Sequence, residues 1–192
     1  MAETAAGRGG AARIWIWFAA AIALDQLFYI LVAPHAEGGH EGSYLVHWHV
    51  IVYALVAGGG LAATGLLGPV QAALFAVLVS CAHAFAVWLA QNFSASDAWH
   101  LPEYMPNGFL GGLAGAAVSL FGLVLIARGG RNAIVTAAIF TLVLAIIGGA
   151  LLPVMLNDDV EHKMGAAQIL LLYVPWQLVF SWAVARIAAR PD

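Results

Sequence analysis

Two ionisable side chains lie deep inside long apolar stretches of this 192-residue sequence. Asp25 stands eight residues before the end of the apolar stretch 14–33, and His83 stands nine residues before the end of the stretch 70–92. At about 1.5 Å per helical residue, both would lie roughly 12–13 Å below a membrane surface. A charged group in hydrocarbon costs about 2.5 kcal/mol or more, so such groups usually face a partner, water or a ligand. The matched depths favour one shared polar site.

A third candidate, His49, would lie about one and a half helical turns below the same surface. Tyr53 follows His49 by four residues and shares its helical face, as Tyr29 does with Asp25. A carboxylate beside an imidazole orients the ring and spares both groups isolated burial. The predicted site for a cofactor or small solute comprises Asp25, His49, Tyr53 and His83, supported by Tyr29 and by Gln26 or Gln168.

Other roles for these side chains stay open. A His–Asp pair can simply hold helices together, and each residue can face an unrelated partner. Two imidazoles at similar depth on neighbouring antiparallel helices are also what a bis-His haem b requires, with His49 and His83 as axial ligands. The sequence contains no glycine-rich phosphate loop, no GxSxG and no HExxH, so it favours a binding role over an enzymatic one.

A second candidate site lies in the polar segment that follows the first apolar stretch. It contains His35, Glu37, His40 and Glu41, with two glycines between the histidines. Imidazole and carboxylate together suit Zn²⁺, Cu²⁺, Ni²⁺ or Co²⁺, and glycine lets the ligands converge. The segment is a candidate loop for capturing a divalent transition metal, although an ordinary solvated loop accounts for the same residues.

The elements that must position these side chains are membrane-spanning helices. Hydrophobic residues make up 63% of the chain and charged residues 9%, and the mean hydropathy is +0.91. A soluble domain carries about 25% charged residues, so a water-exposed surface is excluded. We predict an all-α bundle of six transmembrane helices in the lipid bilayer, because six apolar stretches reach the roughly 20 residues that a span needs. They are 14–33, 44–67, 70–92, 108–127, 133–156 and 164–187.

The distribution of arginine predicts how this bundle lies in the membrane. With a cytoplasmic N-terminus, all six arginines fall on the cytoplasmic side and only Lys163 falls outside. Short cytoplasmic loops collect Lys and Arg, so both termini are predicted to be cytoplasmic, in a bacterial-type inner membrane. The predicted parts are a tail 1–13, a membrane domain 14–187 and a tail 188–192. A net charge of −3 with seven Lys and Arg residues excludes nucleic acid as a partner.

Small and aromatic residues inside the spans carry separate predictions. Glycines at 58–60 and in the stretch 108–127 predict close helix–helix packing; a flat porphyrin or quinone resting against glycine is the alternative. Tyr173 and Trp176 fit an aromatic belt at the outer membrane surface. Pro175 is common in such helices, or it marks a kink beside a cavity.

Three functions are compatible with these features. The first is a pocket, open to the outside, that binds or transports a small solute, a divalent metal ion included. The second is a non-catalytic subunit or scaffold of a larger membrane complex, with other membrane proteins or further copies of the chain as partners. The third is a redox protein that binds haem b. We favour the first, because ionisable residues at matched depth lie below an acidic, histidine-rich outer face.

Overall fold

The computed structural model of the protein describes residues 3–32, 49–92 and 104–189. Within these ranges all regular structure is helical, which confirms the all-α prediction. The helices are α1 (Glu3–Val32), α3 (His49–Ala63), α4 (Pro69–Asn92), α6 (Met105–Ala127), α7 (Arg131–Met155), α8 (Asp158–Met164), the 3-10 helix η2 (Gly165–Gln168) and α9 (Ile169–Ala188).

Five of these helices are long and apolar enough to cross a membrane: the part of α1 from Arg13 to Val32, and the whole of α4, α6, α7 and α9. α3 is apolar too, but its 15 residues are fewer than the roughly 20 that a span needs. The sequence predicted this span over 44–67, of which 44–48 lie outside the described residues. The protein is thus a multi-pass membrane protein with five candidate spans and a sixth, shorter apolar helix.

Two helices begin at residues other than the predicted ones. α6 begins at Met105 rather than at 108, because Pro106 in the first helical turn needs no hydrogen-bonded N–H. α9 begins at Ile169 rather than at 164, because the chain first forms α8 and η2. The Asn157 side chain accepts a hydrogen bond from the Asp159 N–H at 3.0 Å, so it caps α8.

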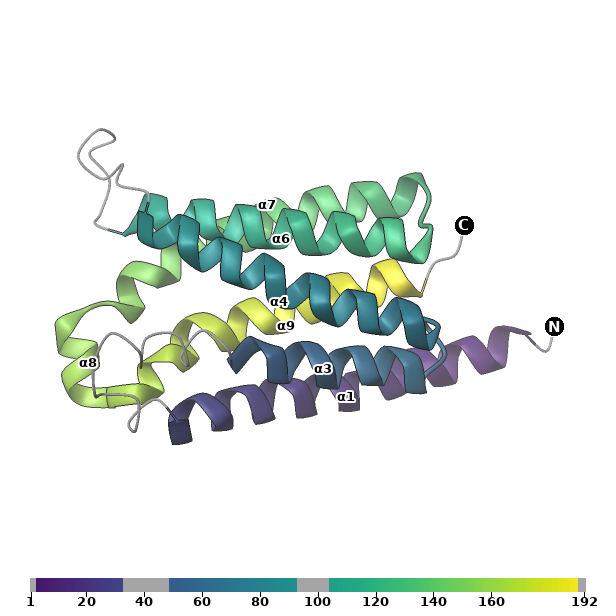
Figure 1. Ribbon diagram of the computed structural model, residues 1–192, viewed down its shortest axis with the longest axis horizontal. Coiled ribbons are helices and arrows are strands. Elements are labelled where there is room, and N and C mark those ends of the chain that lie inside the picture. The colour runs from purple at the N-terminus through teal and green to yellow at the C-terminus, as the bar shows by residue number, and fades with distance from the viewer. Residues whose placement is uncertain (1–2, 33–48, 93–103, 190–192) are drawn as a thin grey trace.

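Helices that are consecutive in the sequence are also neighbours in space (Figure 1). α1 packs on α3, α3 on α4, α4 on α6, α6 on α7 and α7 on α9, and α9 returns to α1 to close a ring. The start of α1 and the end of α9 lie at one end of this ring, and α8 lies at the other (Figure 1). We call the first the arginine end, because it carries Arg13, Arg128, Arg131 and Arg186. We call the second the α8 end.

The half of the bundle toward the arginine end is filled by large apolar side chains. Fully buried members of this core include Phe18, Leu61, Phe75, Leu123 and Phe180. The other half holds the buried polar side chains Asp25, Gln26, His49 and Gln177. The half of the interior toward the arginine end is therefore mainly apolar, and the half toward the α8 end holds most of the buried polar side chains.

Glycines let α6 approach both of its neighbours closely. A Cβ atom on Gly108 would collide with the backbone carbonyl of Gly148 on α7. On the other side of α6, a Cβ atom on Gly111 would lie 3.0 Å from the Ala86 carbonyl oxygen of α4. Backbones approach this closely only where side chains are small or absent. These contacts agree with the predicted role of these glycines in close helix–helix packing.

Candidate ligand-binding pocket

Asp25 is the centre of a buried hydrogen-bond network that joins three helices. Its side chain is fully buried, and its Oδ1 lies 2.8 Å from His49 Nδ1 of α3. Its Oδ2 accepts hydrogen bonds from Gln26 Nε2 at 2.7 Å and from Gln177 Nε2, on α9, at 2.6 Å. Gln26 Nε2 also reaches Gln177 Oε1 at 3.1 Å. Three donors thus satisfy a carboxylate that hydrocarbon could not solvate.

His49 is oriented by this carboxylate. Because a carboxylate only accepts hydrogen bonds, the proton in the His49–Asp25 bond belongs to Nδ1 of the imidazole. A carboxylate in this position fixes both the tautomer and the angle of the ring. Nε2 is then the ring nitrogen that Asp25 does not use, and His49 lines the pocket described below.

Three further rings surround the His49 imidazole. The ring centroids of Tyr29, His83 and Tyr173 lie 5.3, 5.5 and 4.8 Å from that of His49, each in an edge-to-face arrangement. His83 and Tyr173 also contact each other, with centroids 5.7 Å apart. The structure therefore brings Asp25, His49 and His83 into one cluster. Asp25 and His49 meet directly, whereas His83 joins through its ring contact with His49.

The predicted supporting residues divide into those that join the network and those that do not. Gln26 donates to Asp25, as predicted. Tyr53 lies one helical turn beyond His49, but its hydroxyl pairs with the Ser181 hydroxyl at 2.7 Å. Gln168 lies in η2, and its side-chain oxygen is buried with no hydrogen-bond partner among the described residues. Of the two predicted alternatives, Gln26 is therefore the donor to Asp25.

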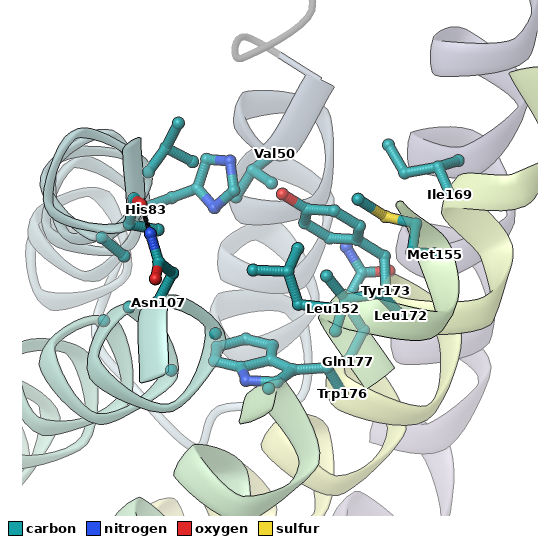
Figure 2. A pocket seen from close by; sticks show the side chains of 18 of the residues that line it. Val50, His83, Asn107, Leu152, Met155, Ile169, Leu172, Tyr173, Trp176 and Gln177 are labelled. Carbon is teal, nitrogen blue, oxygen red and sulfur yellow. Dashed lines mark hydrogen bonds between the residues drawn. The ribbon is translucent and has the colours of Figure 1, made fainter. Parts of the chain in front are cut away.

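A cavity of about 480 Å³ lies beside this cluster, in the polar half of the bundle. Figure 2 shows His83 and Tyr173 pointing toward each other on the cavity, with the Trp176 ring below them in the view. Side chains from the end of α7 and the start of α9 form an apolar wall, which comprises Leu152, Met155, Leu156, Ile169 and Leu172. None of the described residues that line the cavity is an Asp, Glu, Lys or Arg. Pockets of about 300–1,000 Å³ with an apolar wall and a few polar groups are typical of small-molecule sites.

The cavity ends inside the bundle. Its lining residues come from the half of each helix that lies toward the α8 end, and Ser119 and Gln177 are among the innermost. Immediately beyond them, Leu120, Leu123 and Phe180 are fully buried in the apolar core. The described residues therefore enclose a pocket with one closed end and not a channel through the membrane.

Sequence reasoning did not assign three of the residues that build this site. Gln177 was not predicted as a donor to Asp25, and Tyr173 and Trp176 were predicted to lie in an interfacial belt. Instead they line the pocket, and Trp176 stacks on Phe180 with centroids 5.1 Å apart. The signal that could have found them is the spacing of Tyr173, Gln177 and Ser181, which puts three polar side chains on one face of α9.

The described residues give little support to the metal and haem predictions. His35, Glu37, His40 and Glu41 all lie outside those residues. Within them, no three His, Cys, Asp or Glu side chains are grouped so that they could hold a metal ion. The His49 and His83 ring centroids lie 5.5 Å apart, and His49 Nδ1 bonds to Asp25. Haem ligation by these two histidines stays a prediction.

Comparison of the chain with protein-family models, curated proteins and solved structures finds no match. The function therefore has to be inferred from the pocket and its polar cluster.

Proposed function

We propose that this protein binds a small neutral solute in the pocket, from the side of the membrane opposite the arginines. The observation that carries the proposal is a cavity of about 480 Å³ whose described lining has two imidazoles and several hydroxyls but no charged side chain. Charge on the solute would find no countercharge among the described lining residues. Asp25 acts as a positioning residue, because it lies behind His49 and holds the imidazole that faces the solute.

The cavity also argues against a purely structural role for the His–Asp pair. A bundle that served only as a scaffold would bury more apolar surface by filling this space with side chains. The same helices do pack tightly elsewhere, as the Gly108–Gly148 contact shows. A pair that only fastened helices together would need no cavity beside it.

A neutral organic solute suits the pocket better than a metal ion. A bound Zn²⁺ usually takes three or four protein ligands, and the described lining offers only the imidazoles of His49 and His83 as strong ones. Transport to the arginine end would require the core around Leu120 and Phe180 to open, because both are fully buried. Binding is therefore the function that this arrangement supports best.

Filling the pocket tests the proposal directly. We expect Leu172→Trp, on the apolar wall, to displace the bound molecule, because an indole would occupy the space that the solute needs. Leu178→Trp is the matched control: it places the same side chain on the same helix at a position that is 49% exposed. Small molecules would be extracted with solvent from each purified protein and identified by mass spectrometry.

The expected result is one compound recovered from the wild-type protein and from Leu178→Trp, and at least about tenfold less from Leu172→Trp. Equal recovery from all three proteins would show that the compound lies elsewhere on the surface. Recovery of no compound from the wild-type protein would contradict a high-affinity site.

The side of the membrane from which the solute enters has its own test. A reporter enzyme that is active only outside the cytoplasm should work when fused after Gly39, Ser96 or Asp159, and should fail after Pro69, Gly130 or Asp192. We expect this pattern because short cytoplasmic loops are enriched in Lys and Arg, which puts the arginine end on the cytoplasmic side. Activity of the Asp192 fusion would place the pocket on the cytoplasmic side instead.

A further inference from the structure

The lining of the pocket indicates which chemical class of solute it takes, an inference that rests on the proposed function. We infer that the solute is a neutral quinone-type molecule: a flat ring that bears carbonyl oxygens and carries an apolar substituent. The three parts of this description correspond to three features of the pocket, which are its aromatic groups, its hydrogen-bond donors and its apolar wall.

The flat ring is suggested by the aromatic groups at the polar end of the cavity. His49, His83 and Tyr173 contact one another edge to face, with centroids between 4.8 and 5.7 Å apart. Trp176 is held in place by Phe180, on which it stacks with an interplanar angle of 15°. A flat ring inserted here would extend an existing set of aromatic contacts, each of which contributes about 0.5–1.5 kcal/mol beyond burial in measured pairs.

The carbonyl oxygens are suggested by the donors in the lining. The hydroxyls of Tyr29 and Tyr173 and the imidazole of His83 lie on the cavity, and phenolic and imidazole hydrogens donate to carbonyl oxygens. Figure 2 shows the Tyr173 hydroxyl directed toward the His83 ring, so one oxygen placed near them would meet groups from both α4 and α9.

Neutrality and the apolar substituent follow from the rest of the lining. The Asp25 carboxylate already accepts three hydrogen bonds and lies behind His49, so it does not present its charge to the cavity. The wall formed by Leu152, Met155 and Leu172 offers only hydrocarbon and a thioether. A molecule with its ring at the histidines would place an alkyl or isoprenoid substituent along this wall.

Three small probes of similar shape separate these features. The full-length protein in nanodiscs would be dialysed against 2-methyl-1,4-naphthoquinone, 2-methylnaphthalene or 2-naphthoate, and the amount of bound probe would be measured. The amount taken up by empty nanodiscs would be subtracted, because it measures partition into lipid. We expect the quinone to bind about tenfold more tightly than the hydrocarbon, since the two differ only in the carbonyl oxygens. The anionic naphthoate is expected to bind no more than it does to empty nanodiscs.

The variant His83→Phe tests the donor while keeping a ring in place. We expect its preference for the quinone over the hydrocarbon to be smaller than that of the wild type, because one of the three donors is lost, while its affinity for the hydrocarbon stays within about twofold of wild type. Retained binding of the hydrocarbon shows that the pocket is still folded. Cys81→Ala, on the exposed side of the same helix, is the control and should bind all three probes as the wild type does.

Three results would overturn the inference: equal affinity for quinone and hydrocarbon, tighter binding of naphthoate than of quinone, or no binding of the quinone. A different result would contradict the proposed function itself, so the two can be distinguished. If the quinone does not bind but Leu172→Trp still expels a compound from the purified protein, the pocket is a binding site for another class of molecule.

Discussion

Replacement of Asp25 by leucine is expected to lower the free energy of unfolding by about 3–5 kcal/mol, the cost of removing one partner from a buried pair. Three buried donors would lose their acceptor at once: Nδ1 of His49 and the Nε2 atoms of Gln26 and Gln177. Because these residues lie on α1, α3 and α9, the loss would act where the ring of helices closes. Unfolding in mixed micelles, followed by helical circular dichroism, would measure the change.

Asp25→Asn should cost clearly less than Asp25→Leu. The asparagine oxygen can accept the hydrogen bond from His49, and a glutamine amide can rotate so that its oxygen accepts from the new NH₂ group. Ser80→Ala is the control, since the Ser80 hydroxyl bonds only to the Ala76 carbonyl of its own helix. Equal stability of Asp25→Leu and Ser80→Ala would mean that the network contributes nothing to folding.

A double-mutant cycle separates direct from indirect partners in the cluster. Residues in contact typically show interaction energies of about 0.5–3 kcal/mol, and we expect a value in this range for Asp25 with His49. The cycle of Asp25 with His83 should give a smaller value, because these two residues meet only through the His49 ring. Additive effects for Asp25 and His49 would contradict the hydrogen bond between them.

The second large effect is expected from Gly148→Ala. The new Cβ atom would collide with the Gly108 carbonyl of α6, which is backbone and cannot move aside as a side chain can. Overpacking of this kind costs about 1–3 kcal/mol, and separation of α6 from α7 would also widen the pocket that both helices line. We therefore expect a lower melting temperature together with weaker solute binding.

Gly59→Ala provides the matched control, because a Cβ atom on Gly59 would have no neighbour within 4 Å. Its effect should be close to zero or slightly stabilising, by at most about 1 kcal/mol, since alanine favours a helix more than glycine does. The close approach of α6 and α7 would be contradicted if Gly148→Ala melted at the same temperature as Gly59→Ala.

The amino-acid sequence by itself determined that the chain is an all-helical membrane protein, and it located the five helices that are long and apolar enough to span. These properties depend on the composition of each segment of about 20 residues, so no knowledge of its neighbours is needed. It also singled out Asp25, His49 and His83, because ionisable residues within apolar stretches are rare and need a partner.

Only the tertiary structure decided how those residues are connected. Which face of a helix turns inward depends on its rotation and tilt, and these are set by contacts with other helices such as that between Gly108 and Gly148. The donor from Gln177 and the place of Trp176 in the pocket wall both follow from the way α9 meets α1. The hydropathy of a single helix does not predict which of its faces contacts a neighbouring helix, because hydropathy is unchanged by rotation of the helix about its own axis. The hydrogen bond from Gln177 to Asp25 joins residues 152 positions apart, and it exists only once the ring of helices has closed.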